Sequence, residues 1–308
     1  MGNTTYPYAS YRHTTGHLLS GYCTGPFAAR GEGRSPSSGT AGRCPCLPRP
    51  ARRPHVTNLG PLLGLIGNVY PTFAMHFPPF RPEDTDPGAD RRHAQLSVPG
   101  KVMAYTALGE VREDLCRVLD AIYEEELDVS MEFARTLARS FLRRTATSRV
   151  RPEDALASFQ HWLGDRFVRS LRRLREAHPD LPGNLCLTGG CALNIKWNGM
   201  IRASGVFDDV WVPPFPNDSG SALGAACAGM VARTGETRLD WSVHSGPALA
   251  ASGDGRAWGY TRRDCSVGEL ARLLHTTGEP VVVLQGRAEL GPRALGDRSI
   301  LAAAGTPP

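Results

Sequence analysis

The chain has 308 residues, of which 41% are hydrophobic and 21% are charged, values close to those of soluble globular proteins. This length suggests two domains with a sizeable core. The formal net charge of +5 is mild, and no basic run is interleaved with aromatic residues. This balance is compatible with small anionic substrates such as phosphates and nucleotides, and it argues against a nucleic-acid partner.

The distribution of the eight cysteines argues against disulfide bonds. Four stand in apolar stretches, where reduced buried thiols are the usual finding: Cys116, Cys186, Cys191 and Cys227. Cys44 and Cys46 have no matching second pair, which makes a zinc site a poor interpretation. Met1–Ser20 lacks the apolar core of a signal peptide, and no uncharged apolar run is long enough to span a bilayer. We therefore expect a cytoplasmic protein with no membrane contact.

The first chemistry-bearing feature along the chain is a pair of histidines, His13 and His17. On a helix, residues four positions apart share a face, so both rings can bind one metal ion. Such a pair also arises often by chance, and two surface histidines are the competing interpretation.

Between about Arg30 and Arg92 the composition changes sharply to a Pro/Arg/Ser-rich stretch. Frequent prolines fix φ and remove backbone donors, so we expect neither helix nor strand from about Gly31 to Val56. The island Leu59–Phe77 is apolar enough to pack, and a charged loop is expected over Arg81–Arg92.

From Pro99 onward the pattern becomes regular. Gly100–Gly109 is typical of a turn leading into a short apolar element. Apolar residues at three- and four-residue spacings predict two amphipathic helices, over Leu115–Phe141 and Pro152–Ala177. Pro152, followed by two acidic residues, suits the first turn of the second helix.

The next segment alternates strands and helices and predicts an α/β fold with ligands at the strand C-terminal ends. The predicted elements are the strand Asn184–Thr188, a turn at Gly189-Gly190, the helix Ala192–Ala203, the strand Val210–Val212 and the helix Gly220–Val231. The two glycines let the backbone approach a ligand closely, and the following helix N-terminus can offer N–H groups to a phosphate. Plain turn chemistry is the alternative.

Asp218 precedes a helix rich in glycine and alanine. Its carboxylate has three open interpretations: a helix N-cap, a metal ligand or a nucleotide contact.

After a polar linker from about Thr234 to Arg256, the pattern predicts a helix at Val267–His275 and a strand at Pro280–Leu284. The Gly/Arg-rich loop Gly286–Ile300 follows. Its arginines are a plausible anion cradle because guanidinium groups match phosphate oxygens, and an Arg-rich surface loop is the alternative. These arginines are Arg287, Arg293 and Arg298.

Three stretches together resemble the O-carbamoyltransferases of the nodulation-protein and antibiotic-tailoring family: Thr188–Asn194 with the Asp218 segment, Gly286–Ile300, and the histidine pair. The resemblance implies part of an actin-like (ribonuclease-H-like) α/β carbamoyltransferase domain, followed by the start of a YrdC-like α/β domain. The expected domain organisation is a metal-binding segment (1–30), an irregular region (31–98), the C-terminal half of the actin-like domain (99–235), a linker (236–256) and the YrdC-like start (257–308).

The resemblance also implies a reaction and its residues. ATP and carbamoyl phosphate yield carbamoyl-adenylate, and the carbamoyl group passes to a hydroxyl of a sugar or secondary metabolite. It assigns metal ligation, usually of iron, to His13, His17 and Asp218, with Mg²⁺ for the ATP step. Arg287, Arg293 and Arg298 would contact phosphates as catalytic residues. Nucleotide contacts are expected from Gly189, Gly190, Asn194, Ser219 and Lys101, and the resemblance leaves room for a homodimer.

The chain departs from the family's pattern in three places. Family members begin further upstream and continue through a complete YrdC-like domain, so we expect a truncated member. Gly31–Val56 lacks the family's strand pattern, and a compensated frameshift or an error in the gene sequence is a hypothesis for it. The alternatives to an active enzyme are an inactive remnant or partner-dependent fragment and, less favoured, a tRNA threonylcarbamoyl-adenosine protein. The Gly291-Pro-Arg-Ala-Leu-Gly296 motif argues against the last.

Overall fold

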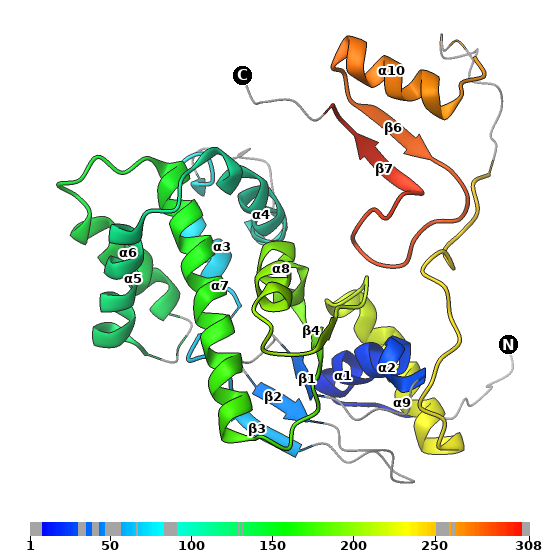
Figure 1. Ribbon diagram of the computed structural model, residues 1–308, viewed down its shortest axis with the longest axis horizontal. Helices are drawn as coiled ribbons and strands as arrows, with labels where there is room; N and C mark the ends of the chain where they lie inside the picture. The colour runs from blue at the N-terminus through cyan, green and yellow to red at the C-terminus, as the bar shows by residue number, and fades with distance from the viewer. Residues whose placement is uncertain are drawn as a thin grey trace, which may run out of the picture. The chain divides into compact units, whose positions relative to one another are not determined.

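The computed structural model describes residues 8–29, 35–38, 43–46, 57–65, 67–82, 91–128, 130, 132–250, 259, 261 and 263–303 (Figure 1). The chain divides into two compact units, Met1–Leu239 and Asp240–Pro308. Among the described residues, no helix combines the length and the apolar character needed to cross a membrane. The cytoplasmic location stays a prediction.

The first unit contains a five-stranded mixed sheet in the order β3-β2-β1-β4-β5. The strands β1, β4 and β5 are parallel, whereas β2 pairs antiparallel with both β1 and β3. Their bounds are β1 Ser35–Ser38, β2 Arg43–Cys46, β3 Thr57–Pro61, β4 Asn184–Thr188 and β5 Asp209–Trp211.

Strands β1 and β2 fall inside the Pro/Arg-rich stretch that was expected to form no strand, and for these residues that expectation is wrong. The β1 backbone pairs in parallel with β4, from Ser35 beside Leu185 to Ser38 beside Thr188. Pairing with a neighbouring strand has overridden the low local strand propensity. The remainder of Gly31–Val56, and most of the predicted loop Arg81–Arg92, lie outside the described residues.

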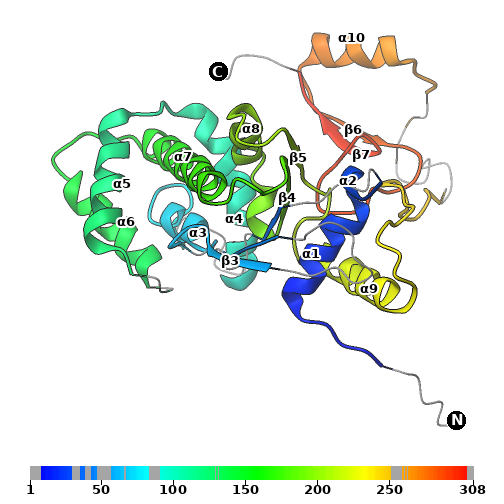
Figure 2. The same cartoon turned by 60° about the horizontal axis from the view of Figure 1, so that its bottom comes forward.

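Helices cover both faces of the sheet. On one face lies α1 (His13–Thr24), followed by the short α2 (Pro26–Ala29), and α9 (Asp218–Thr234) packs against α1 (Figures 1 and 2). On the other face lie α7 (Pro152–Ala177) and α8 (Ile195–Ala203).

The side chains of β4 alternate between these two layers, as strand geometry requires. Leu185 and Leu187 pack with Leu171 of α7 and Ile201 of α8. The β4 residues between and beyond them, Cys186 and Thr188, lie against Gly21 of α1. One short strand therefore links the two helical layers.

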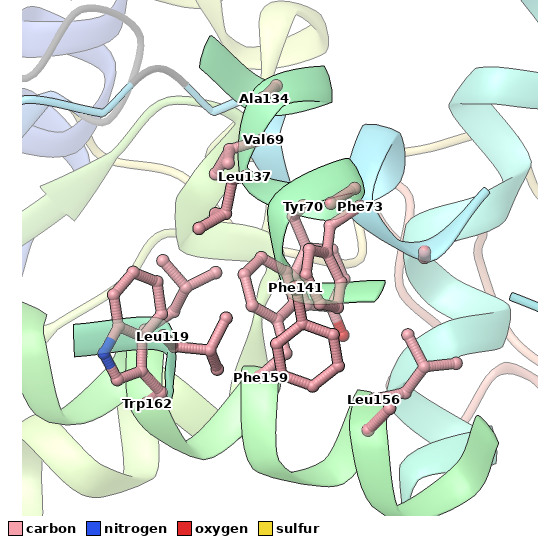
Figure 3. Packing of buried hydrophobic residues seen from close by; sticks show 14 of the residues in the cluster. Val69, Tyr70, Phe73, Leu119, Ala134, Leu137, Phe141, Leu156, Phe159 and Trp162 are labelled. Atoms are coloured by element: carbon pink, nitrogen blue, oxygen red, sulfur yellow. The ribbon is translucent and has the colours of Figure 1, made fainter. Parts of the chain in front are cut away.

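A helical region extends from α7 and holds the largest hydrophobic cluster (Figure 3). It comprises α3 (Val69–Ala74), α4 (Arg91–Tyr105), the 3₁₀ turn η2 (Thr106–Leu108), α5 (Glu113–Glu126) and α6 (Phe133–Arg144). Phe73 stacks on Phe159 with ring centroids 3.8 Å apart and meets Phe141 edge-on at 5.3 Å. Phe159 in turn stacks on Trp162 at 6.0 Å. The expectation that the island Leu59–Phe77 packs into a core is confirmed by Phe73, which is fully buried.

Two sequence expectations in this region are wrong. Leu115–Phe141 is two helices rather than one, because Leu127 leaves helical geometry at ψ 120° and the Ser130 hydroxyl accepts a hydrogen bond from the Phe133 N–H at 3.3 Å. The turn that was expected to lead into a short apolar element within Gly100–Gly109 is absent, because α4 runs through Gly100 to Tyr105 and η2 follows to Leu108. Burial of Val102 and Met103 in the core outweighs the low helix propensity of the preceding Pro99 and Gly100.

Other predictions match closely. Helix α7 has the bounds that were predicted, and strand β4 agrees residue for residue. The predicted helix Ala192–Ala203 is instead a 3₁₀ turn, η3 (Gly190–Leu193), followed by α8, with Asn194 as the helix N-cap between them.

The second unit contains helix α10 (Val267–Thr277) and the antiparallel strands β6 (Val281–Leu284) and β7 (Arg298–Leu301). A capping box starts α10: Ser266 accepts from the Glu269 N–H, and the Glu269 carboxylate accepts from the Ser266 N–H. The predicted loop Gly286–Ile300 ends earlier than expected, because Arg298–Ile300 pair with β6.

Candidate metal centre and anion loop

Three donor atoms from distant parts of the chain meet at one end of α1. The Nε2 atoms of His13 and His17 are 3.0 Å apart. The Asp218 Oδ1 atom lies 3.3 Å from the first and 3.2 Å from the second. The predicted convergence of these side chains is therefore present in the structure.

The two histidines differ in exposure. The His17 side chain is fully buried, whereas those of His13 and Asp218 are 52% and 79% exposed. Surface histidines are therefore a wrong interpretation for His17. Burial, followed by the neighbouring His13, lowers the pKa of His17, against the opposing effects of Asp218 and the Pro216 carbonyl. A neutral imidazole is the form that binds metal ions, so the lowered pKa suits a ligand.

Close approach of α1 and α9 brings the histidines to the carboxylate. A Cβ atom on Gly224 would lie 1.7 Å from the carbonyl oxygen of Gly16, and one on Gly16 would lie 2.7 Å from that of Ser221. Any larger residue at either position would push the helices apart. The sequence analysis noted the Gly/Ala-rich character of α9 but did not identify these two glycines.

Asp218 is the first residue of α9, and Asn217 occupies the N-cap position. The interpretation of Asp218 as the N-cap is therefore wrong, and its carboxylate faces the histidines. Ser219, the predicted nucleotide contact beside it, is exposed and donates its hydroxyl to Asn217 Oδ1 at 2.7 Å.

The glycine turn after β4 is tied to the segment that leads into α9. Gly189 has a φ of 87°, a conformation that favours glycine, and its N–H donates to the Pro216 carbonyl at 2.6 Å. A Cβ on Gly190 would meet nothing within 4 Å. This hydrogen bond therefore joins the turn to Pro216, which precedes Asp218 by two residues in the sequence.

Asn194 is 5% exposed, and its amide is used inside the protein. The Oδ1 atom caps α8 by accepting from the Trp197 N–H at 3.2 Å, and the amide pairs twice with Gln160 at 3.0 and 3.1 Å. Lys101 lies exposed on α4. Nucleotide contacts by Asn194 and Lys101 stay predictions.

In the second unit, a residue that the sequence analysis missed organises the Gly/Arg loop. Glu289 Oε1 accepts hydrogen bonds from the backbone N–H groups of Leu295, Asp297 and Arg298, at 2.9, 2.7 and 3.1 Å. The Arg287 and Arg298 guanidinium groups donate to carbonyl oxygens: Arg287 to Ser245, and Arg298 to Gln285 and Asp297. Arg293, the remaining arginine of the predicted cradle, is partly buried.

The triangle of His13, His17 and Asp218 fits a metal ion. A divalent ion about 2.1 Å from each donor, at angles between square and tetrahedral, separates the donors by about 3.0–3.4 Å. The observed separations of 3.0, 3.2 and 3.3 Å lie in that range. Two histidines and one carboxylate leave coordination positions open, and this ligand set is frequent at non-haem iron(II) sites.

Comparison with known protein families agrees with this picture. Residues 3–227 match the family model described as Carbamoyltransferase N-terminus, and residues 271–308 match the one described as Carbamoyltransferase C-terminus. The chain therefore belongs to the carbamoyltransferase family, as the sequence motifs implied.

Named relatives are longer than this chain. Nodulation protein U of Bradyrhizobium diazoefficiens is 42% identical over 328 residues, covering 100% of this chain and 55% of the relative. Nodulation protein U of Rhizobium tropici is 43% identical over 97% of this chain and 53% of the relative. The 3'-hydroxymethylcephem-O-carbamoyltransferase of Streptomyces clavuligerus is 33% identical over 68% of this chain and 40% of the relative. The chain thus spans about half the length of the nodulation proteins it matches.

Proposed function

We propose that the chain takes part in O-carbamoyl transfer from carbamoyl phosphate to a hydroxyl of a sugar or secondary metabolite. The observation that carries the proposal is the convergence of His13, His17 and Asp218 within 3.3 Å of one another. Family membership and the similarity to a cephem O-carbamoyltransferase support the same reaction class.

The reaction proceeds in two stages in this proposal. Carbamoyl phosphate and ATP, with one water consumed, give carbamoyl-adenylate, phosphate and pyrophosphate. The acceptor hydroxyl oxygen then bonds to the carbamoyl carbon, AMP leaves, and the hydroxyl proton is lost. Mg²⁺ accompanies the ATP step.

His13, His17 and Asp218 would hold a divalent ion, for which we propose iron. When bound, such an ion supplies Lewis-acid polarisation of a carbonyl oxygen. The buried His17 fixes one side of the site, while the exposed His13 and Asp218 leave the other side accessible to a ligand. The Gly189-Gly190 turn, hydrogen-bonded to Pro216, offers backbone at this end of the sheet for contact with the adenylate.

Arg287, Arg293 and Arg298 would contact phosphate groups during adenylate formation. Arg287 and Arg298 donate to carbonyl oxygens rather than carboxylates within the described residues, so their positive charge is not cancelled by an ion pair there. For the fold, we propose an actin-like origin for the mixed sheet of the first unit and a YrdC-like origin for the second. The helices on both faces of the sheet support the first assignment.

The main competing function is an inactive remnant. We do not favour it, because the three donors lie at the separations that a metal-binding active site requires.

The test is carbamoyl-phosphate-dependent formation of AMP and pyrophosphate by the purified chain, with ATP, Mg²⁺ and iron(II). The expected result is turnover in the wild-type chain and its loss in Arg293→Ala, with Arg272→Ala, an exposed arginine on α10, as the matched control. Absence of turnover from folded wild-type protein, with hydroxyl acceptors present, would favour the remnant.

A further inference from the structure

The Glu289 carboxylate is the centre of the loop between β6 and β7. A single oxygen, Oε1, accepts from three backbone N–H groups that belong to Leu295, Asp297 and Arg298. Two glycines with positive φ, Gly291 (105°) and Gly296 (120°), let the chain turn back towards this oxygen. The Glu289 side chain thereby closes the loop through three backbone hydrogen bonds.

The hydrogen bonds indicate that Glu289 is ionised. Although desolvation raises its pKa, the backbone N–H groups of Leu295, Asp297 and Arg298 outweigh that effect and lower the pKa to about 2. A carboxylate with several backbone donors is stabilised in its charged form. Among the described residues, the Glu289 carboxylate therefore accepts hydrogen bonds from the backbone and forms no ion pair with Arg287 or Arg298.

Arg287 and Arg298 are close to these hydrogen-bonded residues in sequence. Arg298 follows directly from Asp297, whose N–H Glu289 binds, and Arg287 stands two residues before Glu289. When the loop backbone is already fixed, less conformational entropy is lost as the guanidinium groups bind an anion than when the loop is mobile.

We infer that Glu289 is a positioning residue, which fixes the Gly291–Arg298 loop so that Arg287 and Arg298 bind the phosphate of a phosphate-bearing substrate. This inference rests on the anion-binding role proposed above for the arginines. Glu289 itself does not touch the ligand; it acts through the backbone of the loop.

The charge of Glu289 makes the inference testable by the direction in which phosphate affinity changes. Replacing Glu289 by glutamine removes a negative charge near the arginines, which by charge alone strengthens binding of an anion. Glutamine keeps an acceptor oxygen but not its charge, so the three N–H bonds to residue 289 become weaker, and the less firmly held loop weakens binding instead. The two effects oppose each other, so the direction of the change separates positioning from a simple charge effect.

The experiment is calorimetric titration of the full chain with inorganic phosphate at pH 7.5. We expect Glu289→Gln to weaken phosphate binding about tenfold, because the three loop hydrogen bonds lose their charge assistance and the arginines are held less firmly. Glu289→Asp, ionised but shorter, should bind with intermediate strength. The matched control is Glu279→Gln, the same charge change at an exposed position of the same unit, and it should leave binding unchanged or slightly stronger.

Amide hydrogen exchange supplies the second readout: Leu295, Asp297 and Arg298 should lose protection in Glu289→Gln and keep it in Glu279→Gln. If Glu289→Gln unfolds the β6–β7 pair, Glu289→Asp decides the question in the same two assays. Unchanged or tighter phosphate binding by the folded variants overturns the inference.

Arg287→Ala and Arg298→Ala separate this inference from the proposed function. If both weaken phosphate binding while Glu289→Gln does not, the positioning role fails and the arginine role stands. If neither weakens it, or if the wild-type chain binds no phosphate, the anion-binding role itself fails.

Discussion

Gly224 of α9 lies against Gly16 of α1 so closely that a Cβ atom on Gly224 would be 1.7 Å from the Gly16 carbonyl oxygen. Gly16 lies between His13 and His17 in the sequence of α1, and Gly224 lies on α9, the helix that begins with Asp218. The separation of the three proposed metal ligands therefore depends on two residues that contribute no side chain.

The first prediction concerns the crossing of α1 and α9 at Gly16 and Gly224. Gly224→Ala forces the helices apart, and we expect about 1–3 kcal/mol of destabilisation, as for overpacked cores, together with weaker binding of a divalent ion. Chemical denaturation and titration with cobalt(II), followed by its absorbance, measure the two effects.

Gly229→Ala on the same helix is the matched control. A Cβ there would have its nearest neighbours at 3.5 Å, an ordinary contact. Because alanine is the better helix former, this variant should be as stable as the wild type or more stable by about 0.5–1 kcal/mol. Equal metal affinity in Gly224→Ala and Gly229→Ala would contradict the proposed role of the crossing.

The second prediction concerns the metal ligands. His17→Asn removes one of three donors, and its metal affinity should fall by more than the roughly 10–100-fold typical of losing an outer-shell partner. Titration with iron(II) or cobalt(II), and the thermal stabilisation that the ion confers on the wild-type chain, report the change. His161→Asn, an exposed histidine on α7, should behave as the wild type. Retained affinity in His17→Asn would rule out this residue as a ligand.

The third prediction is a pH dependence in the second unit. Desolvation raises the pKa of Glu289, but the backbone N–H groups of the loop prevail and lower it from 4.5 to about 2. Because the folded-state pKa is depressed, this carboxylate stabilises the loop above about pH 4.5 and loses that effect as the pH falls towards 2. The protection factor of the Leu295 amide, which corrects for the intrinsic pH dependence of exchange, should fall across this window in the wild type and show no such step in Glu289→Gln.

The fourth prediction tests the buried amide pair of Gln160 and Asn194. The Tyr70 hydroxyl also donates to Gln160 Oε1, at 2.6 Å, so Gln160→Leu leaves buried polar groups of both Tyr70 and Asn194 without their partner. We expect a loss of about 1–3 kcal/mol for each group left unsatisfied. Chemical denaturation measures it, with His161→Leu at the adjacent exposed position as the control. A Gln160→Leu chain as stable as that control would show that the network contributes little.

Features set by local sequence were predicted well. The i,i+4 spacing of His13 and His17 and the apolar spacing of α7 each follow from helix geometry alone. The grouping of Asp218 with the histidines was predictable only from the family resemblance, because about two hundred residues separate them and no local pattern encodes the contact.

The failures share a physical cause. Strands β1 and β2 exist through pairing with β4 and β3, and α4 continues through Pro99 because its next turn is buried. In each case tertiary contacts outweighed a local preference. Glu289 was missed because no local pattern indicates which groups its carboxylate binds, and only the folded loop shows that it accepts from backbone N–H groups.

The alternation along β4 also makes the proposed metal centre sensitive to strand register. Because Cys186 and Thr188 lie against Gly21 of α1 while Leu185 and Leu187 face α7 and α8, a slip of one residue would turn a leucine towards the glycine. A Cβ on Gly21 would already approach the Cys186 Sγ to 2.6 Å, so there is no room for the larger side chain. Helix α1 therefore packs against β4, and brings His17 to Asp218, only when the strands pair in the correct register.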